Sequence, residues 1–424
     1  EGRDFIVDYL AALAAKDPKF VVLDDRQIAF EKIEPQEGSE RKHPFWRSAF
    51  VLKDPKDIAR IIDSGIKEVW IDTAKGLDVA GVGQAKAEAE ASVERQLQSV
   101  AAPSSADKTE RVPFAEEAKR AAKTVAKAKQ AVTSMFNEAR MGKALDGEEA
   151  LPLVEEISGS ISRNPGAIIS LARLKDKDEY TYMHSVAVCA LMIALARQLG
   201  LDEQQTRGAG LAGLLHDIGK MMIPDAVLNK PGKLTDEEFT LVKSHPEEGH
   251  KLLLSGKNIN AVALDVCLHH HEKTDGSGYP HRLSGDAISL FAKMGAVCDV
   301  YDAITSNRPY KNGWDPGESI RKMTEWANGH FDETVFRAFV KSLGIYPIGS
   351  LVRLQSGRLG VVVDQTGKSL LTPKVRVFFS TKSDAHIAPE LLDLSRPGAR
   401  DKIISPEDPV KWKLGKLDKL LFAA

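Results

Sequence analysis

The segment GAGLAGLLHDIGK, residues 208–220, decides the fold of the central part of the chain. Its first eight residues are apolar or glycine on every side of a helix, so this helix must be buried. The helix ends in His216 and Asp217, which Gly219 and Lys220 follow. Burying an imidazole beside a carboxylate costs several kcal/mol unless the two are paired or bind a metal ion. The segment therefore predicts a helical domain with a functional His-Asp pair in its core.

Residue types that ligate metals recur elsewhere in the same region. Eight of the 11 histidines fall between residues 184 and 281. Several of them stand at the ends of apolar helical segments, and two aspartates lie inside another such segment. The ligand candidates besides the His-Asp pair are His184, His245, His270, His271 and Asp299. Five separate elements therefore each bring a ligand-type residue to a position that we expect to be buried.

The donor set indicates which metals such a site would take. Imidazoles and carboxylates without thiolates suit Fe, Mn, Zn, Ni or Co better than Mg or Ca alone. Asp217 has two carboxylate oxygens and can bridge two ions, as in hydrolytic sites whose two metals lie about 3.5–4 Å apart. The sequence thus predicts a metal centre with Asp217 in its middle.

Several neighbouring residues have more than one interpretation. Asp302 shares a helix face with Asp299, because the two are three residues apart, and it either positions a ligand or a backbone group or is structural. Glu272 either orients a ligating histidine from behind or has no such role. Three further histidines are expected to be neighbours of the site and not ligands: His250, His269 and His281.

The composition excludes several classes of protein. The chain has 424 residues, 43% of them hydrophobic and 28% charged, which is typical of a globular protein with two or three domains. Its 58 Lys and Arg against 60 Asp and Glu give a net charge of −2, so no basic field exists that would hold a nucleic-acid polymer. The longest apolar run, residues 186–196, is about half of the roughly 20 residues that a membrane span needs, and we expect no span.

Cysteine usage favours a cytoplasmic protein. Cys189, Cys267 and Cys298 lie in apolar surroundings without CxxC spacing, which argues against disulfides and against a thiolate zinc site. The first residues show no charged-then-apolar signal segment. We therefore expect the chain to work in a reduced, cytosolic compartment.

The domain organisation follows from changes in pattern. Residues 1–82 predict a small α+β module, with strands at 20–23, 50–52 and 69–71 and a helix at 58–66. Residues 83–112, rich in Ala, Ser and charge, are predicted to be a linker. Residues 150–342 are predicted to be all-α, with helices at 187–199, 208–215, 239–254, 259–268, 290–304 and 316–326. Runs at 351–354, 360–363 and 375–379 predict a small β element within residues 343–424.

A long connecting helix is predicted over residues 113–149. Apolar residues recur there in alternating steps of four and three, at Phe114, Ala118, Ala121, Val125, Ala128, Val132, Met135 and Ala139. In one interpretation this seam, residues 114–139, forms a homodimeric coiled coil that transmits signals from the N-terminal module. In the other it packs against the chain's own helical domain, because an alanine-rich seam makes a weak coiled coil.

The motifs resemble those of a known family. His184, His216, Asp217 and Asp299 are similar to the H…HD…D pattern of the HD metal-dependent phosphohydrolase superfamily. The more specific HD-GYP subfamily is matched by His270-His271-Glu272, by DGSGYP at 275–280 and by RPYK at 308–311. This resemblance covers about residues 165–342. The N-terminal module, with Phe45-Trp46 and VWID at 69–72, resembles an uncharacterised domain often found ahead of HD-GYP domains.

The resemblance implies a fold, an activity and a set of site residues. It implies an all-α HD-type catalytic domain, preceded by the α+β module and the long helix and followed by the β element. The activity would be hydrolysis of cyclic di-GMP, a bacterial second messenger, to pGpG and GMP by a hydroxide that bridges two metals. The implied metal ligands are His184, His216, Asp217, His245, His270, His271 and Asp299. Lys220 would contact the scissile phosphate, Arg308 and Lys311 would hold phosphates, and Tyr279 would shape the loop over a guanine.

Some parts of this assignment rest on single positions. Gly278 lets the 275–280 loop adopt backbone angles that other residues resist. Family members with three metals carry a Glu four residues before the first His, where this chain has Tyr180. We therefore predict two divalent ions and not three. From the donor set, these ions are expected to be Fe or Mn, with Zn, Ni and Co as alternatives.

Two other functions stay open. The loss of the third-metal Glu points to a non-hydrolysing cyclic di-GMP sensor, whereas an intact Lys220 and seven ligands favour catalysis. An HD phosphohydrolase acting on another nucleotide is disfavoured by the GYP segment and by residues 308–311. The N-terminal module is expected to be regulatory and to contact signalling proteins.

Overall fold

The computed structural model describes residues 21–23, 50–52, 91–93, 95–97, 100, 112–174, 180–230, 232–306, 313–366, 369–415 and 417–422. The chain forms two compact units, residues 1–94 and 95–424. In the first unit, β1 (Val21–Leu23) pairs antiparallel with β2 (Phe50–Leu52), on two of the predicted strands. The predicted strand at 69–71, the helix at 58–66 and the residues 45–46 lie outside the described residues. Within the predicted linker, residues 91–93, 95–97 and 100 are helical.

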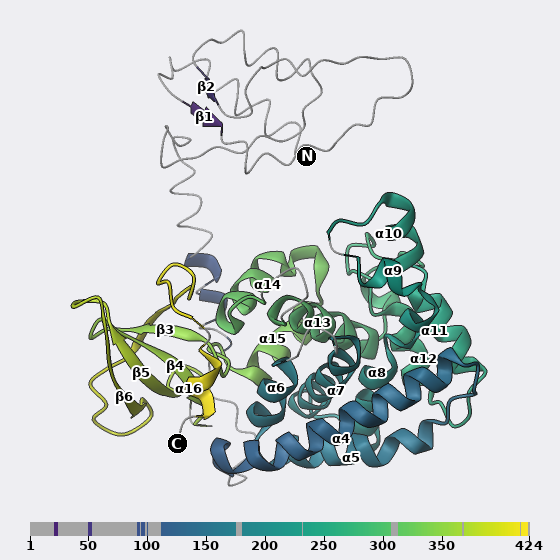
Figure 1. The fold of residues 1–424 in the computed structure, drawn as a ribbon, viewed down its shortest axis with the longest axis horizontal. Helices are drawn as coiled ribbons and strands as arrows, with labels where there is room; N and C mark the ends of the chain where they lie inside the picture. The colour runs from purple at the N-terminus through teal and green to yellow at the C-terminus, as the bar shows by residue number, and fades with distance from the viewer. Residues whose placement is uncertain are drawn as a thin grey trace. The chain divides into compact units, whose positions relative to one another are not determined.

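The second unit is a helical body followed by an antiparallel sheet (Figure 1). Its helices are α4 (Phe114–Arg140), α5 (Gly147–Arg163), α6 (Pro165–Arg173), α7 (Tyr180–Gln198), α8 (Glu203–Leu215), α9 (Asp225–Leu228), α10 (Asp236–Val242), α11 (His245–Leu254), α12 (Ala261–His269), α13 (Leu290–Thr305), α14 (Pro316–His330), α15 (Glu333–Leu343) and α16 (Asp418–Phe422), with the 3-10 helices η2 (Ile218–Met222) and η3 (Gly285–Ala287). The predicted all-α character of residues 150–342 is confirmed in the described part of that range.

The core of the body is the pair α7 and α8. Every residue of the apolar run 186–196 in α7 is buried, as is every residue from 208 to 215 in α8. The two helices approach closely at Gly213, where an added Cβ would lie 2.9 Å from the Val188 carbonyl oxygen. Because the helices touch through backbone, His184 near the start of α7 comes to lie beside His216 at the end of α8.

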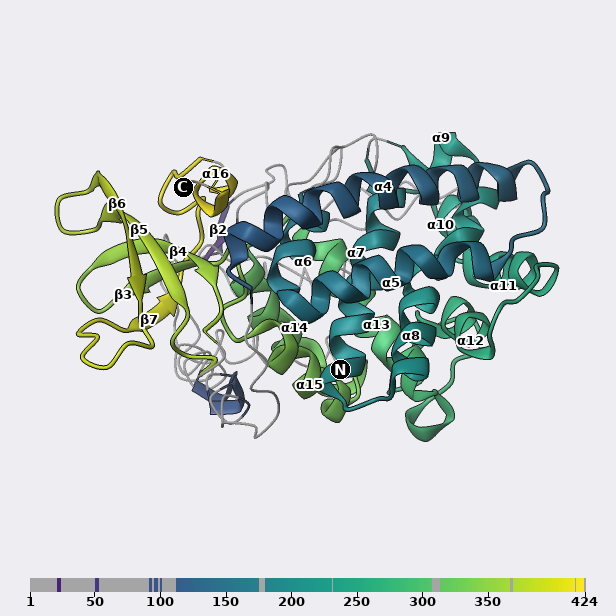
Figure 2. The same ribbon diagram turned by 90° about the horizontal axis from the view of Figure 1, so that it is seen from below.

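Helix α4 lies along the body next to α5, α6 and α7 (Figure 2). Most of the predicted seam is buried there, whereas Val125 and Met135 are only partly buried and Phe136 is fully buried. A straight helix repeats every 3.6 residues and drifts away from a heptad, which moves the buried position from 135 to 136. The packing interpretation of this helix is therefore the observed one. The helix also ends at Arg140, short of residue 149, because Gly142 follows with a φ of 78°.

The prediction of one helix over residues 239–254 is wrong. Helix α10 ends at Val242, and a new helix, α11, starts at His245. Pro246 explains the break, because it lacks the N–H that would bond the Val242 carbonyl in a continuing helix, and its ring clashes with that carbonyl. The break matters for the site, since it makes His245 the first residue of α11.

The C-terminal β element is a sheet with the strand order β6-β5-β4-β3-β7. Its strands are β3 (Leu351–Leu354), β4 (Arg358–Asp364), β5 (Lys374–Ser380), β6 (Ala385–Asp393) and β7 (Ile403–Pro406). The three predicted runs correspond to β3, β4 and β5, which are largely buried. Strand β6 lies at an edge and is mostly exposed, so it lacks the apolar pattern by which a strand is predicted.

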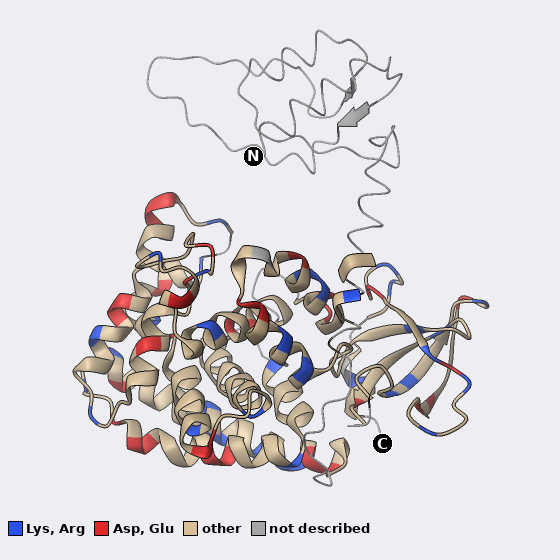
Figure 3. Cartoon of the chain, turned by 180° about the vertical axis from the view of Figure 1, so that it is seen from behind, with Lys and Arg blue, Asp and Glu red and all other residues tan. Residues whose placement is uncertain are grey.

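The surface of the described part is mixed in charge. Lys and Arg, as well as Asp and Glu, are scattered over the helices in Figure 3, in keeping with the net charge of −2. Among the described residues, none of the helices is both long enough and apolar enough to span a bilayer.

Candidate metal centre

The structure brings all seven predicted metal ligands together in the helical body. They come from five places: His184 in α7, His216 and Asp217 after α8, His245 at the start of α11, His270 and His271 after α12, and Asp299 in α13. All except His271 are buried, and the His271 side chain is 23% exposed. The elements that the sequence marked as separate carriers of ligand-type residues therefore converge on one point.

Glycines allow this convergence. A Cβ on Gly219 would lie 1.9 Å from the carbonyl oxygen of His245, and a Cβ on Gly249 would lie 2.7 Å from Cys267 Sγ. Helix α11 can therefore pack directly on η2 and α12. This contact brings His245 to the side of Asp217.

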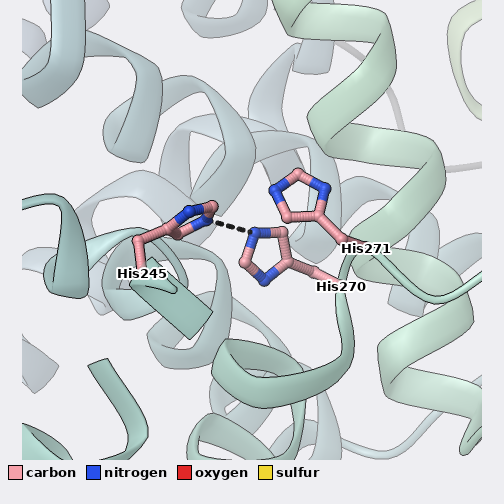
Figure 4. Close-up of side chains that lie close together, drawn as sticks. All are labelled: His245, His270 and His271. Atoms are coloured by element: carbon pink, nitrogen blue, oxygen red, sulfur yellow. Dashed lines mark hydrogen bonds between the residues drawn. The ribbon is translucent and has the colours of Figure 1, made fainter. Parts of the chain in front are cut away.

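The first group of donors consists of His184, His216 and Asp299, whose ligand atoms lie within 4.8 Å of one another. The Nε2 atom of His184 lies 3.0 Å from Asp299 Oδ1 and 3.2 Å from His216 Nε2. The second group consists of His245, His270 and His271, whose rings converge in Figure 4. There, His245 Nε2 and His270 Nε2 are 3.3 Å apart.

Asp217 lies between the two groups, and its two oxygens face different ones. Oδ2 is 3.3 Å from His184 Nε2 and 3.4 Å from His216 Nε2. Oδ1 is 3.2 Å from His245 Nε2 and 3.8 Å from His270 Nε2. Oδ1 is buried and accepts no hydrogen bond from any residue that the structure describes. A buried carboxylate oxygen without a donor is costly unless a cation satisfies it.

Hydrogen bonds at Nδ1, on the side of the ring away from the metal centre, orient the imidazoles. The Nδ1 atoms of three of them donate to backbone carbonyls: His216 to Gly213 at 2.8 Å, His245 to Val242 at 2.7 Å and His270 to Val266 at 3.0 Å. Because a carbonyl can only accept, Nδ1 carries a proton, and the neutral form of each ring points its Nε2 lone pair inward. Two such lone pairs face each other at the His245–His270 contact, an arrangement that a cation between them would stabilise.

The protonation states also suit metal binding. Burial would raise the pKa of Asp217, but Lys220 and the nearby imidazoles hold that pKa well below its usual value. The pKa of Asp299 is likewise lowered, with His184 and His216 outweighing its burial. Burial lowers the pKa of His271 to about 3. Ionised carboxylates and a neutral imidazole are the donor forms that bind metal ions.

His184 differs, because three carboxylates surround it. Burial opposes its charged form, but hydrogen bonds with Asp217, Asp299 and Asp302 raise its pKa to about 10. One of these partners, Asp302, accepts from His184 Nδ1 at 2.6 Å. Of the interpretations of Asp302, the one in which it positions a ligand is therefore observed. Asp302 fixes the His184 ring so that its Nε2 atom faces Asp217 and Asp299.

We expect Asp302→Ala to weaken metal binding by about 10–100-fold, because a partner behind a ligating imidazole contributes that much to affinity. Calorimetric titration of the metal-free protein with Mn²⁺ would measure the change. Asp302→Asn, which still offers an oxygen to Nδ1, should lose less. Equal Mn²⁺ affinity for the wild type and Asp302→Ala would contradict the role of Asp302.

The predicted substrate contacts are only partly described. The Lys220 ammonium bonds Asp217 Oδ2, and the lysine side chain is 21% exposed. The ring of Tyr279 stacks on His271 with centroids 4.7 Å apart. Gly278 is buried where a Cβ would meet the Glu272 Cα at 2.5 Å, so close packing is the constraint at this glycine. Arg308, Lys311 and the Tyr180 side chain lie outside the described residues.

Glu272 has a role that sequence reasoning did not find. Its buried carboxylate accepts from the backbone N–H groups of His281 at 2.7 Å and Leu283 at 3.0 Å. It thus secures the loop after Tyr279 and does not orient a histidine. His269 bonds Asp265 and His281 and is no member of the two donor groups, as predicted.

The residues present fit a pair of divalent cations. Six imidazole and carboxylate side chains form two groups of three, and Asp217 joins them. The donor set contains no thiolate, since Cys189, Cys267 and Cys298 are buried and free elsewhere. Such a centre can activate water and neutralise a phosphate ester.

Comparison with known proteins agrees with this chemistry. Residues 163–335 match the HD domain family, and residues 37–150 match a domain of unknown function (DUF3391), a match that extends past the predicted boundary at residue 82 and through α4. A cyclic di-GMP phosphodiesterase of Pseudomonas aeruginosa is 56% identical over 384 residues, 90% of this chain and 91% of that protein.

Two further relatives match a smaller part of the chain. A cyclic di-GMP phosphodiesterase response regulator of Xanthomonas campestris is 52% identical over 35% of this chain and 39% of its own length. A 3'3'-cGAMP-specific phosphodiesterase of Vibrio cholerae is 36% identical over 39% of this chain and 38% of its own. Taken with the metal centre and the GYP segment, the match over nine tenths of both chains shows that this protein belongs to the HD-GYP family of HD-domain proteins.

Proposed function

We propose that the protein is a metal-dependent phosphodiesterase that hydrolyses cyclic di-GMP. One observation carries the chemistry: the two oxygens of the buried Asp217 face separate groups of imidazoles. The substrate rests on the Pseudomonas aeruginosa relative, which is a cyclic di-GMP phosphodiesterase and matches this chain over nearly its whole length.

The proposed centre holds two divalent ions, Fe or Mn, with Zn, Ni or Co as alternatives. The ligands would be His184, His216 and Asp299 on one side, His245, His270 and His271 on the other, and Asp217 between them. Ions bound there would supply Lewis-acid catalysis and would lower the pKa of a water nucleophile.

The chain's own residues then act on the phosphate and the bases. Lys220 lies at the open side of the centre, where its ammonium would stabilise negative charge that develops on the leaving oxygen. Arg308 and Lys311 are proposed to hold phosphate oxygens. Tyr279, whose ring packs on His271, would offer a face on which a guanine stacks.

A second candidate substrate has specific support. Relatives in Vibrio cholerae are specific for 3'3'-cGAMP and match about two fifths of this chain. Cyclic di-GMP is preferred, because the cGAMP-specific relatives are only 36% and 37% identical, against 56% for the cyclic di-GMP relative. The identity of the final product, pGpG or GMP, follows from the same assay.

The test is anaerobic purification of the full chain, metal analysis and a hydrolysis assay. We expect two metal equivalents per chain and hydrolysis of cyclic di-GMP that chelation abolishes and Fe²⁺ or Mn²⁺ restores. Three equivalents would contradict the argument from Tyr180. Tight binding of cyclic di-GMP without turnover, under every added metal, would favour the sensor function instead.

A cytoplasmic location is supported by three buried, free cysteines. The N-terminal module, predicted over residues 1–82, is proposed to be regulatory and to contact signalling proteins. A homodimer through α4 would have to use the exposed face of that helix, because most of its predicted apolar seam is buried within the chain.

A further inference from the structure

A lysine without a carboxylate partner in the described part of the chain lies at the C-terminal end of α10. Lys243 caps α10, and its Nζ atom lies 4.4 Å from the ring centroid of Phe239 and 5.6 Å from that of Tyr279. Lys243 pairs with no carboxylate among the residues that the structure describes. Two other lysines of this region do pair with a carboxylate: Lys230 with Glu238, and Lys251 with Glu248.

This lysine is tied to the metal centre through backbone and through rings. His245, two residues later, donates from Nδ1 to the carbonyl of Val242 at 2.7 Å, which fixes the end of α10 relative to the donor groups. On the other side, Tyr279 stacks on His271, one of the proposed ligands. Lys243 therefore lies one ring outward from His271, whose side chain is partly exposed.

Phe239 extends the same surface. It lies four residues before Lys243, on the same face of α10, and its side chain is 48% exposed. No side chain of α10 is buried, so Phe239 does not serve a core. A single exposed aromatic residue is ordinary, but here the aromatic ring and the unpaired cation stand together beside the proposed base-stacking tyrosine.

We propose that Lys243 and Phe239 form a substrate-positioning contact beside Tyr279. The Lys243 ammonium binds the phosphate of a cyclic dinucleotide that is not cleaved, and the Phe239 ring stacks on one of its bases. A cyclic dinucleotide has two phosphates, and the metal centre can hold only the one that reacts. A lysine without a carboxylate partner supplies the charge that the second phosphate requires. This inference rests on the proposed function, since it needs a substrate with two phosphates.

The test compares two substrates in the full-length, metal-loaded protein. Lys243→Met should raise the KM for cyclic di-GMP about tenfold and leave kcat within about twofold, because one charge-assisted contact is lost and the reacting groups are untouched. Hydrolysis of bis(p-nitrophenyl) phosphate, which has a single phosphate, should not change. Lys243→Arg should restore most of the affinity, and Phe239→Ala should raise the KM for cyclic di-GMP alone.

Lys251→Met is the matched control, because Lys251 is exposed and already paired. An unchanged KM for cyclic di-GMP in Lys243→Met would overturn the inference. An equal loss on both substrates would also overturn it, since Lys243 would then act through the fold or at the reacting phosphate. A wild type that cleaves the small diester but no cyclic dinucleotide would instead refute the proposed function.

Discussion

Asp217→Ala is expected to lower the turnover of cyclic di-GMP by at least about a thousandfold, because it removes the group that joins the two donor groups and with it several kcal/mol of transition-state stabilisation. Asp217 approaches an imidazole of each group at 3.2–3.3 Å. Without it, neither proposed ion keeps its shared ligand. Steady-state kinetics of the metal-loaded protein, with circular dichroism to verify the helices, would measure the effect.

Two further variants make this result interpretable. Asp217→Asn keeps the shape of the side chain but removes its charge, so it should lose turnover even if Asp217→Ala folds poorly. Asp225→Ala removes an exposed aspartate that pairs with Arg140 and should keep normal turnover. Full activity of a folded, metal-replete Asp217→Asn protein would show that the centre does not work through a bridging carboxylate.

Gly219→Ala is expected to destabilise the helical body by about 3 kcal/mol, because overpacking against backbone cannot be relieved by a change of rotamer. Its Cβ would lie 1.9 Å from the His245 carbonyl oxygen and 2.4 Å from the Gly249 nitrogen. Relief requires α11 to move away from η2, which takes His245 away from Asp217. Metal content and turnover should therefore fall together with stability. Denaturant unfolding followed by circular dichroism would measure the change.

Gly208→Ala is the control for that variant. Gly208 lies in α8, and its Cβ would meet its nearest neighbour at an ordinary 3.5 Å. Alanine favours a helix over glycine by about 1 kcal/mol, so this variant should be at least as stable as the wild type. If Gly219→Ala were as stable and as active as Gly208→Ala, close packing of α11 on η2 would not be what forms the site.

The parts of the site that could be predicted are those in which a polar residue stands in an otherwise apolar segment of the sequence. His216, Asp217 and Asp299 stand in segments that are otherwise apolar, so their burial and their need for a partner follow from the cost of burying polar groups. The structure brings these residues together with His184, His245, His270 and His271. That these residues ligate metal stays a prediction.

The parts that could not be predicted depend on tertiary contacts. The face shared by Asp299 and Asp302 did not reveal that Asp302 bonds His184, which is 118 residues away along the chain. Glu272 follows two proposed ligands directly, yet its carboxylate binds backbone of the next loop. Strand β6 is exposed on both faces of the sheet at most positions and therefore has no apolar pattern.

Anomalous diffraction from crystals of the full chain grown with Mn²⁺ would examine the metal centre itself. Two peaks about 3.5–4 Å apart are expected, one on each side of Asp217. The ion at one peak should be ligated by His184, His216 and Asp299, and the ion at the other by His245, His270 and His271. A single peak, or no peak between side chains that turn away from one another, would contradict the two-metal centre on which the proposed hydrolysis depends.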